Sequence, residues 1–302
     1  MRNTFLLSFS FLCASVLSVT GCSTMTPHSS DSPQMANLLL AEPAPVSVRS
    51  QMAIARYNQI LAEAPLKDNE RAELFYQRGM LYDSVGLSGL ARADFTQAIQ
   101  LKPDLAEAYN SIGIHYIQQM DFIQAYEAFD STLDINPEYD FALLNRGIAL
   151  YYGGRADLAI KDLQDFYAKD EADPYRALWA FIAEQAVAPE SASAHLRVAR
   201  DKLDAKNWAV LIVDFYLGRI GENDLLNALV IGVTSQNQLT DRLCEAYFYL
   251  GKFHNALEHR GIASNYFKLA LSTNVYEYVE HRYARLELNL LREQAFRDVQ
   301  AQ

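Results

Sequence analysis

Apolar residues recur at three- and four-residue intervals along most of the chain, which is the spacing of helices with one buried face. No segment alternates apolar and polar residues with a period of two, so the sequence predicts no β-sheet. Short turns separate helical segments at residues 86–89, 120–121 and 153–154. The pattern therefore predicts an all-α chain in which helices follow one another in pairs.

A period of 34 residues runs through the first half of the predicted helices. It places Gly79, Gly113 and Gly147 in step, together with Ala91, Ala125 and Ala159, and with Phe95, Phe129 and Leu163. This spacing and these residue types match the tetratricopeptide repeat (TPR), a pair of antiparallel helices that stacks on its neighbours. Small residues are expected where the two helices cross, and aromatic residues between successive repeats.

The repeats divide the chain into segments. A repeat region at 65–173 holds units at 72–105, 106–139 and, in degenerate form, 140–173. Residues 174–243 predict helices that leave the 34-residue register, either as degenerate repeats or as a helical insert. A further repeat at 244–277 and a last helix fill 244–292, before a polar tail at 293–302. The predicted fold is an all-α TPR solenoid with extra non-repeat helices.

The first residues predict a lipoprotein signal. Arg2 precedes an apolar stretch that is too short and too rich in serine to remain as a membrane-spanning helix. The sequence Val-Thr-Gly-Cys at 19–22 then resembles the bacterial lipobox; the alternative is an ordinary cleavage site beside a chance cysteine. Residues 1–21 are therefore expected to be removed. Cys22 is expected to carry diacylglycerol and an N-acyl chain, with no other cofactor.

The segment after Cys22 predicts a lipid-anchored protein held away from the membrane. Several acyl chains together anchor a protein durably. Ser23 favours sorting to the outer membrane, and the Ser- and Pro-rich residues 22–46 predict a flexible tether. A helix at 47–64 precedes the first repeat. It is predicted to cap the solenoid, or to pair with a second copy through Met52, Ile54, Ala55 and Ile60.

Charge and composition exclude several classes of function. With Lys+Arg 26 against Asp+Glu 37, the net charge of −11 argues against nucleic-acid binding. Three cysteines exclude a disulfide scaffold. The six histidines include no zinc-binding HExxH motif, and His254 and His259, which flank a predicted turn, lack a third metal ligand. No catalytic or metal-binding residue is predicted, and a non-enzymatic protein is favoured over a hidden enzyme.

Function is then expected on the groove lined by the first helix of each repeat. The TPR positions assign to this groove Tyr76, Met80 and Asp83, then Asn110, Ile114 and Ile117, then Leu144, Ile148 and Tyr151. A mostly apolar groove with a few polar residues suits a protein or peptide ligand, and no Lys/Arg cluster for a terminal carboxylate is present. The alternative is that inserted helices or a second subunit already fill the groove.

The order of these segments resembles the NlpI family of Gram-negative outer-membrane lipoproteins. The stretches LLNRGIALYYGGR at 143–155, YEAFD at 126–130 and VEHRYA at 279–284 carry this resemblance. It implies a periplasm-facing homodimer that touches the membrane only through its lipid. It also implies an adaptor that brings a tail-specific periplasmic protease to a peptidoglycan endopeptidase and organises other cell-wall hydrolases. The alternative is a structural lipoprotein that assists outer-membrane protein assembly.

Overall fold

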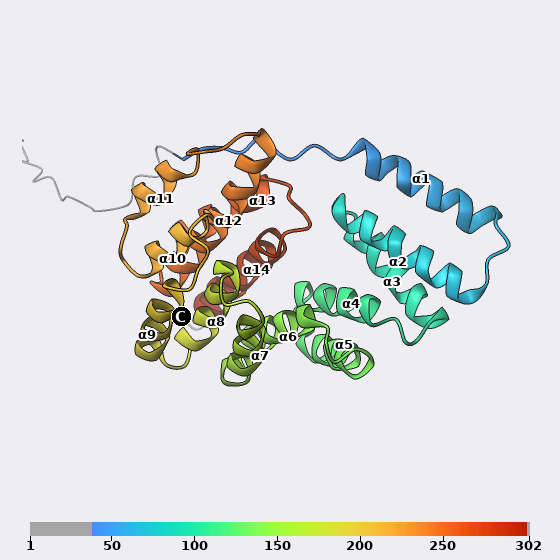
Figure 1. Ribbon diagram of the computed structural model, residues 1–302, viewed down its shortest axis with the longest axis horizontal. Coiled ribbons are helices and arrows are strands. Elements are labelled where there is room, and N and C mark those ends of the chain that lie inside the picture. Colours follow the sequence, from blue (N-terminus) through green and yellow to red (C-terminus); the bar gives the residue numbers. More distant parts are fainter. Residues whose placement is uncertain (1–37, 301–302) are drawn as a thin grey trace, which may run out of the picture. The chain divides into compact units, whose positions relative to one another are not determined.

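A computed structural model describes residues 38–300, and residues 39 onward belong to one compact unit (Figure 1). The expected signal at 1–21, Cys22 and the tether up to residue 37 lie outside the described residues. The described part is helical and contains no strand. None of its helices has both the length and the apolar content that crossing a bilayer requires.

The helices follow one another with short connections. They are α1 (Val48–Glu63), α2 (Asp68–Ser84), α3 (Ser88–Leu101), α4 (Ala106–Gln118), α5 (Phe122–Ile135), α6 (Asp140–Tyr152), α7 (Ala156–Lys169), α8 (Pro174–Gln185), α9 (Pro189–Arg200), α10 (Val210–Tyr216), α11 (Glu222–Ala228), α12 (Gln236–Ala256), α13 (Arg260–Ser272) and α14 (Val279–Gln300). The bounds of α2 to α7 confirm the predicted pairs of helices, and the prediction of an all-α TPR fold is confirmed.

The glycine of each repeat lies where its two helices cross. A Cβ atom on Gly113 would stand 2.5 Å from Cε1 of Phe129, closer than packed carbon atoms approach. In the later pair α12–α13, a Cβ atom on Gly251 would stand 2.6 Å from Cε1 of Phe267. Both phenylalanines are fully buried. The separate repeat predicted at 244–277 therefore has the same crossing as the earlier ones, although α12 begins eight residues before it, at Gln236.

Helices α8 and α9 continue the stack as a degenerate repeat, which is one of the two alternatives predicted for residues 174–243, and α9 leaves the register by one residue because it begins 33 residues after α7. Helix α8 begins 34 residues after α6 and packs against both α7 and α9. In α9, the buried residues Ala192, Leu196 and Ala199 repeat the spacing of the buried residues of α7. Ala180 stands where that spacing calls for the crossing glycine, and leucine replaces the aromatic residue. These replacements hide the repeat in the sequence.

The two ends of the described chain also differ from expectation. Residues 39–46 were expected to belong to a flexible tether, yet they hydrogen-bond to α12 and to the end of α13. Tyr247 donates its hydroxyl hydrogen to the carbonyl of Leu39, and the N–H of Ala44 donates to the carbonyl of Thr273 at 2.7 Å. Helix α14 extends to Gln300, through most of the predicted polar tail, and Phe296 is exposed there. We call residues 39–46 the N-terminal strap.

Helix α1 packs against α2 through one side only. Leu61 is buried, whereas the side chain of Met52 is 70% exposed. Of the other residues predicted to pair two copies, Ala55 is exposed, and Ile54 and Ile60 are half-buried. Pairing through α1 therefore stays a prediction, with Met52 and Ala55 as its accessible residues.

Candidate protein-binding groove

The first helices α2, α4 and α6 carry the predicted groove residues, but most of these residues are not accessible. Asp83, Asn110, Ile117, Leu144 and Ile148 are buried, and Ile117 and Ile148 have no exposed surface. Tyr76, Ile114 and Tyr151 are half-buried, and Met80 is 38% exposed. The assignment of Ile117 and Ile148 to a ligand surface is therefore wrong, because both side chains fill space between packed helices.

Two polar groove residues are already engaged inside the protein. Asn145 of α6 donates an amide hydrogen to Oδ1 of Asn110 in α4 at 3.0 Å, and both residues are buried. Asp83 at the end of α2 accepts a hydrogen bond of 3.4 Å from Arg282 and lies 3.2 Å from Nε2 of His115. These side chains hold helices together and are not available to anchor a ligand.

Helix α14 covers the part of the groove that lies near the ends of the first helices. It packs against α4 and α12, and its Arg282 reaches Asp83 of α2. The hydroxyl of Tyr152 in α6 donates to Oε1 of Glu287 in α14 at 2.8 Å. The alternative predicted inserted helices or a second subunit in the groove, whereas the helix that packs against this part of it is the last one, α14.

A buried ion pair fixes this arrangement. Nζ of Lys252 in α12 lies 2.6 Å from Oε1 of Glu287, and the two side chains are only 6% and 2% exposed. Nζ also donates to the Tyr151 hydroxyl at 2.9 Å and lies 4.4 Å from the centre of that ring. Burial lowers the pKa of Lys252, but the charge and hydrogen bonds of Glu287 and Tyr151 together outweigh it, so the pKa of Lys252 is raised. Tyr151, predicted to contact a ligand, thus has its hydroxyl bound to Lys252.

The first helices α2, α4 and α6 line the groove with what we call the inner face. The part of this face that stays open lies near the N-terminal ends of α4 and α6. A cavity of about 530 Å³ there is lined by Glu73 and Tyr76 of α2 and Glu107 of α4, and its other charged residues are Lys102 and Asp104. One repeat later, at the place equivalent to Glu73 and Glu107, Phe141 is 56% exposed. This open inner face combines aromatic and acidic side chains, which suits a protein ligand with apolar and basic groups.

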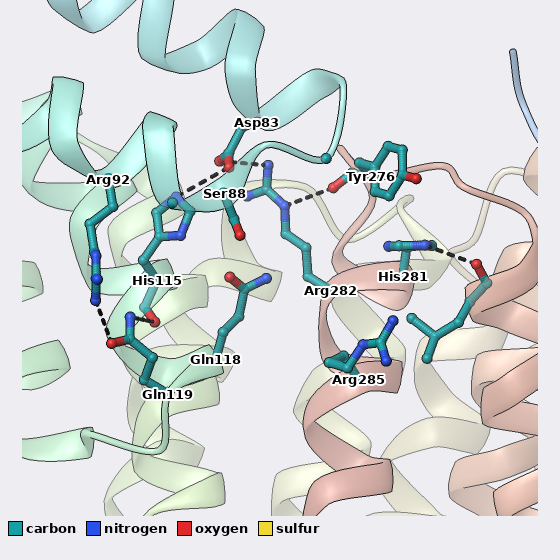
Figure 2. A pocket seen from close by; sticks show the side chains of 13 residues that line it. Asp83, Ser88, Arg92, His115, Gln118, Gln119, Tyr276, His281, Arg282 and Arg285 are labelled. Carbon is teal, nitrogen blue, oxygen red and sulfur yellow. Dashed lines mark hydrogen bonds and ion pairs between the residues drawn. The ribbon is translucent and has the colours of Figure 1, made fainter. Parts of the chain in front are cut away.

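A second opening faces the covered end of the groove (Figure 2). Its volume is about 420 Å³, and it lies between the α2–α3 turn and α4 on one side and α13 and α14 on the other. Arg92, Arg282 and Arg285 line it, and none of them was predicted as a site residue. The three-residue spacing of Arg282 and Arg285 on one helix was visible in the sequence, but only the fold brings them to Asp83.

The residues weighed for metal binding and thiol chemistry lie in packed surroundings. His254 pairs through Nε2 with Glu222 at 2.8 Å, and its Nδ1 lies 3.3 Å from Nδ1 of His259. Within residues 38–300, no three His, Cys, Asp or Glu side chains are placed to share a metal ion. Cys244 is fully buried, and this burial raises the pKa of its thiol. None of these groups offers an accessible reactive site.

The described repeats define the chain as a helical-repeat protein of the TPR class. No protein-family model matches the chain. Among solved structures, MamA is 21% identical over 51% of this chain and 88% of its own, with a TM-score of 0.46. A tetratricopeptide repeat protein from Parabacteroides merdae is 17% identical over 81% of this chain and 78% of its own, also with a TM-score of 0.46. The pilF protein of Pseudomonas aeruginosa is 18% identical over 73% of this chain and 99% of its own, with a TM-score of 0.42.

Proposed function

We propose that the chain is a non-enzymatic, lipid-anchored adaptor of the NlpI type that binds other proteins in the periplasm of a Gram-negative bacterium. The observation that carries this proposal is the open inner face of the repeat helices, where Tyr76, Met80 and Phe141 are accessible. Large apolar side chains on such a face favour protein binding over solvent exposure alone.

The partners in this proposal are a tail-specific periplasmic protease, a peptidoglycan endopeptidase and other cell-wall hydrolases. The support is the resemblance of residues 143–155 and 279–284 to the NlpI family. An adaptor acts by effective concentration: two weakly associating proteins that are held on one scaffold meet far more often than in free solution. Pairing of two copies through the exposed side of α1, at Met52 and Ala55, would bring two such surfaces together.

A capture experiment with the chain from residue 23 to 302 tests the adaptor proposal. The immobilised protein should retain a tail-specific protease and a peptidoglycan endopeptidase from an envelope extract. The double variant Met80→Asp/Phe141→Asp should retain at least about tenfold less endopeptidase, because two carboxylates replace apolar contacts. Mass spectrometry of the bound fraction measures this loss.

The matched control for this experiment is Ile123→Asp/Leu158→Asp. It places the same charges on the exposed sides of the second helices α5 and α7. Capture should be unchanged in the control. Equal losses of endopeptidase capture in both double variants would show that the inner face is not the binding surface. Capture of a β-barrel assembly component alone would overturn the adaptor proposal in favour of a role in outer-membrane protein assembly.

The proposed outer-membrane anchor depends on Cys22 and predicts a specific labelling result. Cells that express the full chain should incorporate labelled palmitate into the protein, and Cys22→Ser should abolish the label and release the protein from the membrane fraction. Cys244→Ser is the control, because that thiol is fully buried in the folded chain. Label that persists in Cys22→Ser and disappears in Cys244→Ser would contradict the anchor.

A further inference from the structure

The pocket in Figure 2 carries an excess of positive charge on a strongly acidic protein. Three arginines line its volume of about 420 Å³, whereas Asp83 is its only acidic residue. The chain as a whole has a net charge of −11. Such a cluster of cations is unfavourable unless anions neutralise it, because unpaired arginines at one place repel one another.

The three arginines are not equally engaged. Arg282 donates to Asp83 at 3.4 Å and to the carbonyl of Tyr276 at 3.0 Å, which fixes its position in the wall. Arg92 donates to the neutral side chain of Gln119. Arg285 is exposed and has neither an ion pair nor a hydrogen bond with any described residue. Two guanidinium groups thus lack an anionic partner at one opening.

Other groups around the opening also present hydrogen-bond donors. Helix α3 starts at this pocket with Ser88 and Gly89, and it has neither a side-chain cap nor an acidic residue in its first turn. Its free N–H groups and helix dipole favour an anion at this end. His115 is only 4% exposed, and its Nε2 makes no hydrogen bond within the described residues, although Oδ1 of Asp83 lies 3.2 Å away.

We propose that this pocket binds the carboxylate of an acidic peptide segment from a partner protein. Arg285 of α14 and Arg92 of α3 supply the cations that pair with it, and Arg282, on the same side as Arg285, is held in place by Asp83 and Tyr276. The planar fork of a guanidinium group matches the two oxygens of a carboxylate. Leu271 and Tyr276 give the pocket apolar surface for the aliphatic part of a glutamate. The identity of the ligand as a protein segment rests on the proposed adaptor function.

The amide side chains in the pocket favour a peptide over an isolated inorganic anion. Gln118 of α4 and Gln119 beside it line the opening, and the side chain of Gln118 faces the space between α4 and α14 (Figure 2). The amide of Gln118 has no hydrogen bond with any described residue and offers both a donor and an acceptor, which is what the main chain of a bound peptide requires. The amide of Gln119 is already engaged, because its oxygen accepts from Arg92 and its nitrogen donates to the carbonyl of His115 at 3.0 Å. An inorganic phosphate would use the arginines but leave the acceptor oxygen of Gln118 without a partner.

Calorimetric titration of the chain from 23 to 302 with short synthetic peptides tests the proposal. The first probe is acetyl-Ala-Glu-Ala-Glu-Ala-amide, and the second has Gln in place of both Glu residues. We expect binding of the first that is at least about tenfold tighter than that of the second. A third probe, the Gln peptide with a free C-terminal carboxylate, tells a terminal carboxylate from a side-chain carboxylate.

The decisive variant is Arg285→Gln, because Arg285 makes no hydrogen bond or ion pair with a described residue that its removal would break. It should weaken binding of the Glu peptide about tenfold. Arg292→Gln is the matched control: it removes an arginine from the same helix, where Arg292 contacts only Asn289 at 3.4 Å. The Arg292→Gln variant should bind the Glu peptide as tightly as the unmodified chain does.

Three results would overturn the proposal: equal binding of the Glu and Gln peptides, equal losses in Arg285→Gln and Arg292→Gln, or binding of inorganic phosphate without binding of any peptide. The titration is independent of hydrolase capture. If the pocket binds no peptide but hydrolase capture persists, only the pocket proposal is overturned. If the pocket binds the peptide but no hydrolase is captured, only the adaptor proposal is overturned.

Discussion

Replacing Lys252 with Met should lower the free energy of unfolding by about 3–5 kcal/mol, because it leaves the carboxylate of Glu287 buried without its cation. Glu287 is 2% exposed, and its other described partners are the Tyr152 hydroxyl and the Asn255 amide. Neither neutral group replaces a full positive charge at 2.6 Å. Urea denaturation followed by circular dichroism measures the loss.

Two further variants separate this effect from a general loss of charge. Lys161→Met removes a lysine whose side chain is 80% exposed and whose ion pair with Asp165 joins neighbouring turns of one helix. It should change stability by less than about 1 kcal/mol. Lys252→Met combined with Glu287→Leu removes both buried charges and should recover much of the loss. Similar losses for Lys252→Met and Lys161→Met would contradict the importance of the buried pair.

The free energy of unfolding should fall by about 1–2 kcal/mol as the pH rises from 6.5 to 8.5. Two buried carboxyl groups, Glu245 of α12 and Glu280 of α14, are the cause. Burial is the main reason that their pKa values lie well above the usual range, and Glu280 adds repulsion that raises the pKa of Glu245 further. Glu245 accepts a hydrogen bond of 2.7 Å from Trp208, and Glu280 accepts one of 3.2 Å from Tyr249.

Stability falls as the pH rises because the folded chain binds more protons than the unfolded chain. In the unfolded chain both carboxyl groups lose their protons near pH 4.5, whereas the folded chain keeps them to higher pH, so the folded state binds more protons in between. Their contribution is present below pH 4.5 and is lost as the pH rises through the folded pKa values. Burial lowers the pKa of His281 from 6.5 to about 4, so this residue opposes the trend mainly below pH 6.5 and by only a few tenths of a kcal/mol at the lower end of the chosen range.

Glu245→Gln tests this assignment, because a neutral amide oxygen can still accept the Trp208 hydrogen bond. The variant should flatten the decline of stability between pH 6.5 and 8.5, as measured by urea denaturation at several pH values. Glu293→Gln, at an exposed position of α14, should leave the decline unchanged. A decline that is equally steep in all three proteins would assign the pH dependence to other groups.

The repeats were predictable because their packing is local. Gly113 and Phe129 must meet at one crossing, and that requirement is visible as a fixed spacing in the sequence. Helices α8 and α9 were predicted, but the sequence left open whether they form a degenerate repeat or an insert, because Ala180 and Leu196 meet the same requirement with different residues. The length of α14 was missed because its last two turns are exposed, and Phe296 and Val299 alone are too few to mark an apolar period.

The groove was predicted less well than the fold, for a physical reason. In a repeat array that ends without further helices, positions such as Ile117 and Ile148 line an open groove. In this chain both side chains are fully buried. Here α14 packs against α4, and the contact between Arg282 and Asp83 joins residues 199 positions apart. No local pattern encodes a pairing at that separation, so neither the covered part of the groove nor the arginine pocket was visible in the sequence.

The N-terminal strap changes how this chain must complete its folding. In an open repeat array each pair of helices contacts only its neighbours, and folding can spread from any point. Here the hydrogen bond from Tyr247 to Leu39 closes a loop of 208 residues. Bringing such distant segments together carries an entropic cost that must be met before the contact forms. During synthesis the early repeats can form as they emerge, but the strap has no partner until α12 and α13 have been made.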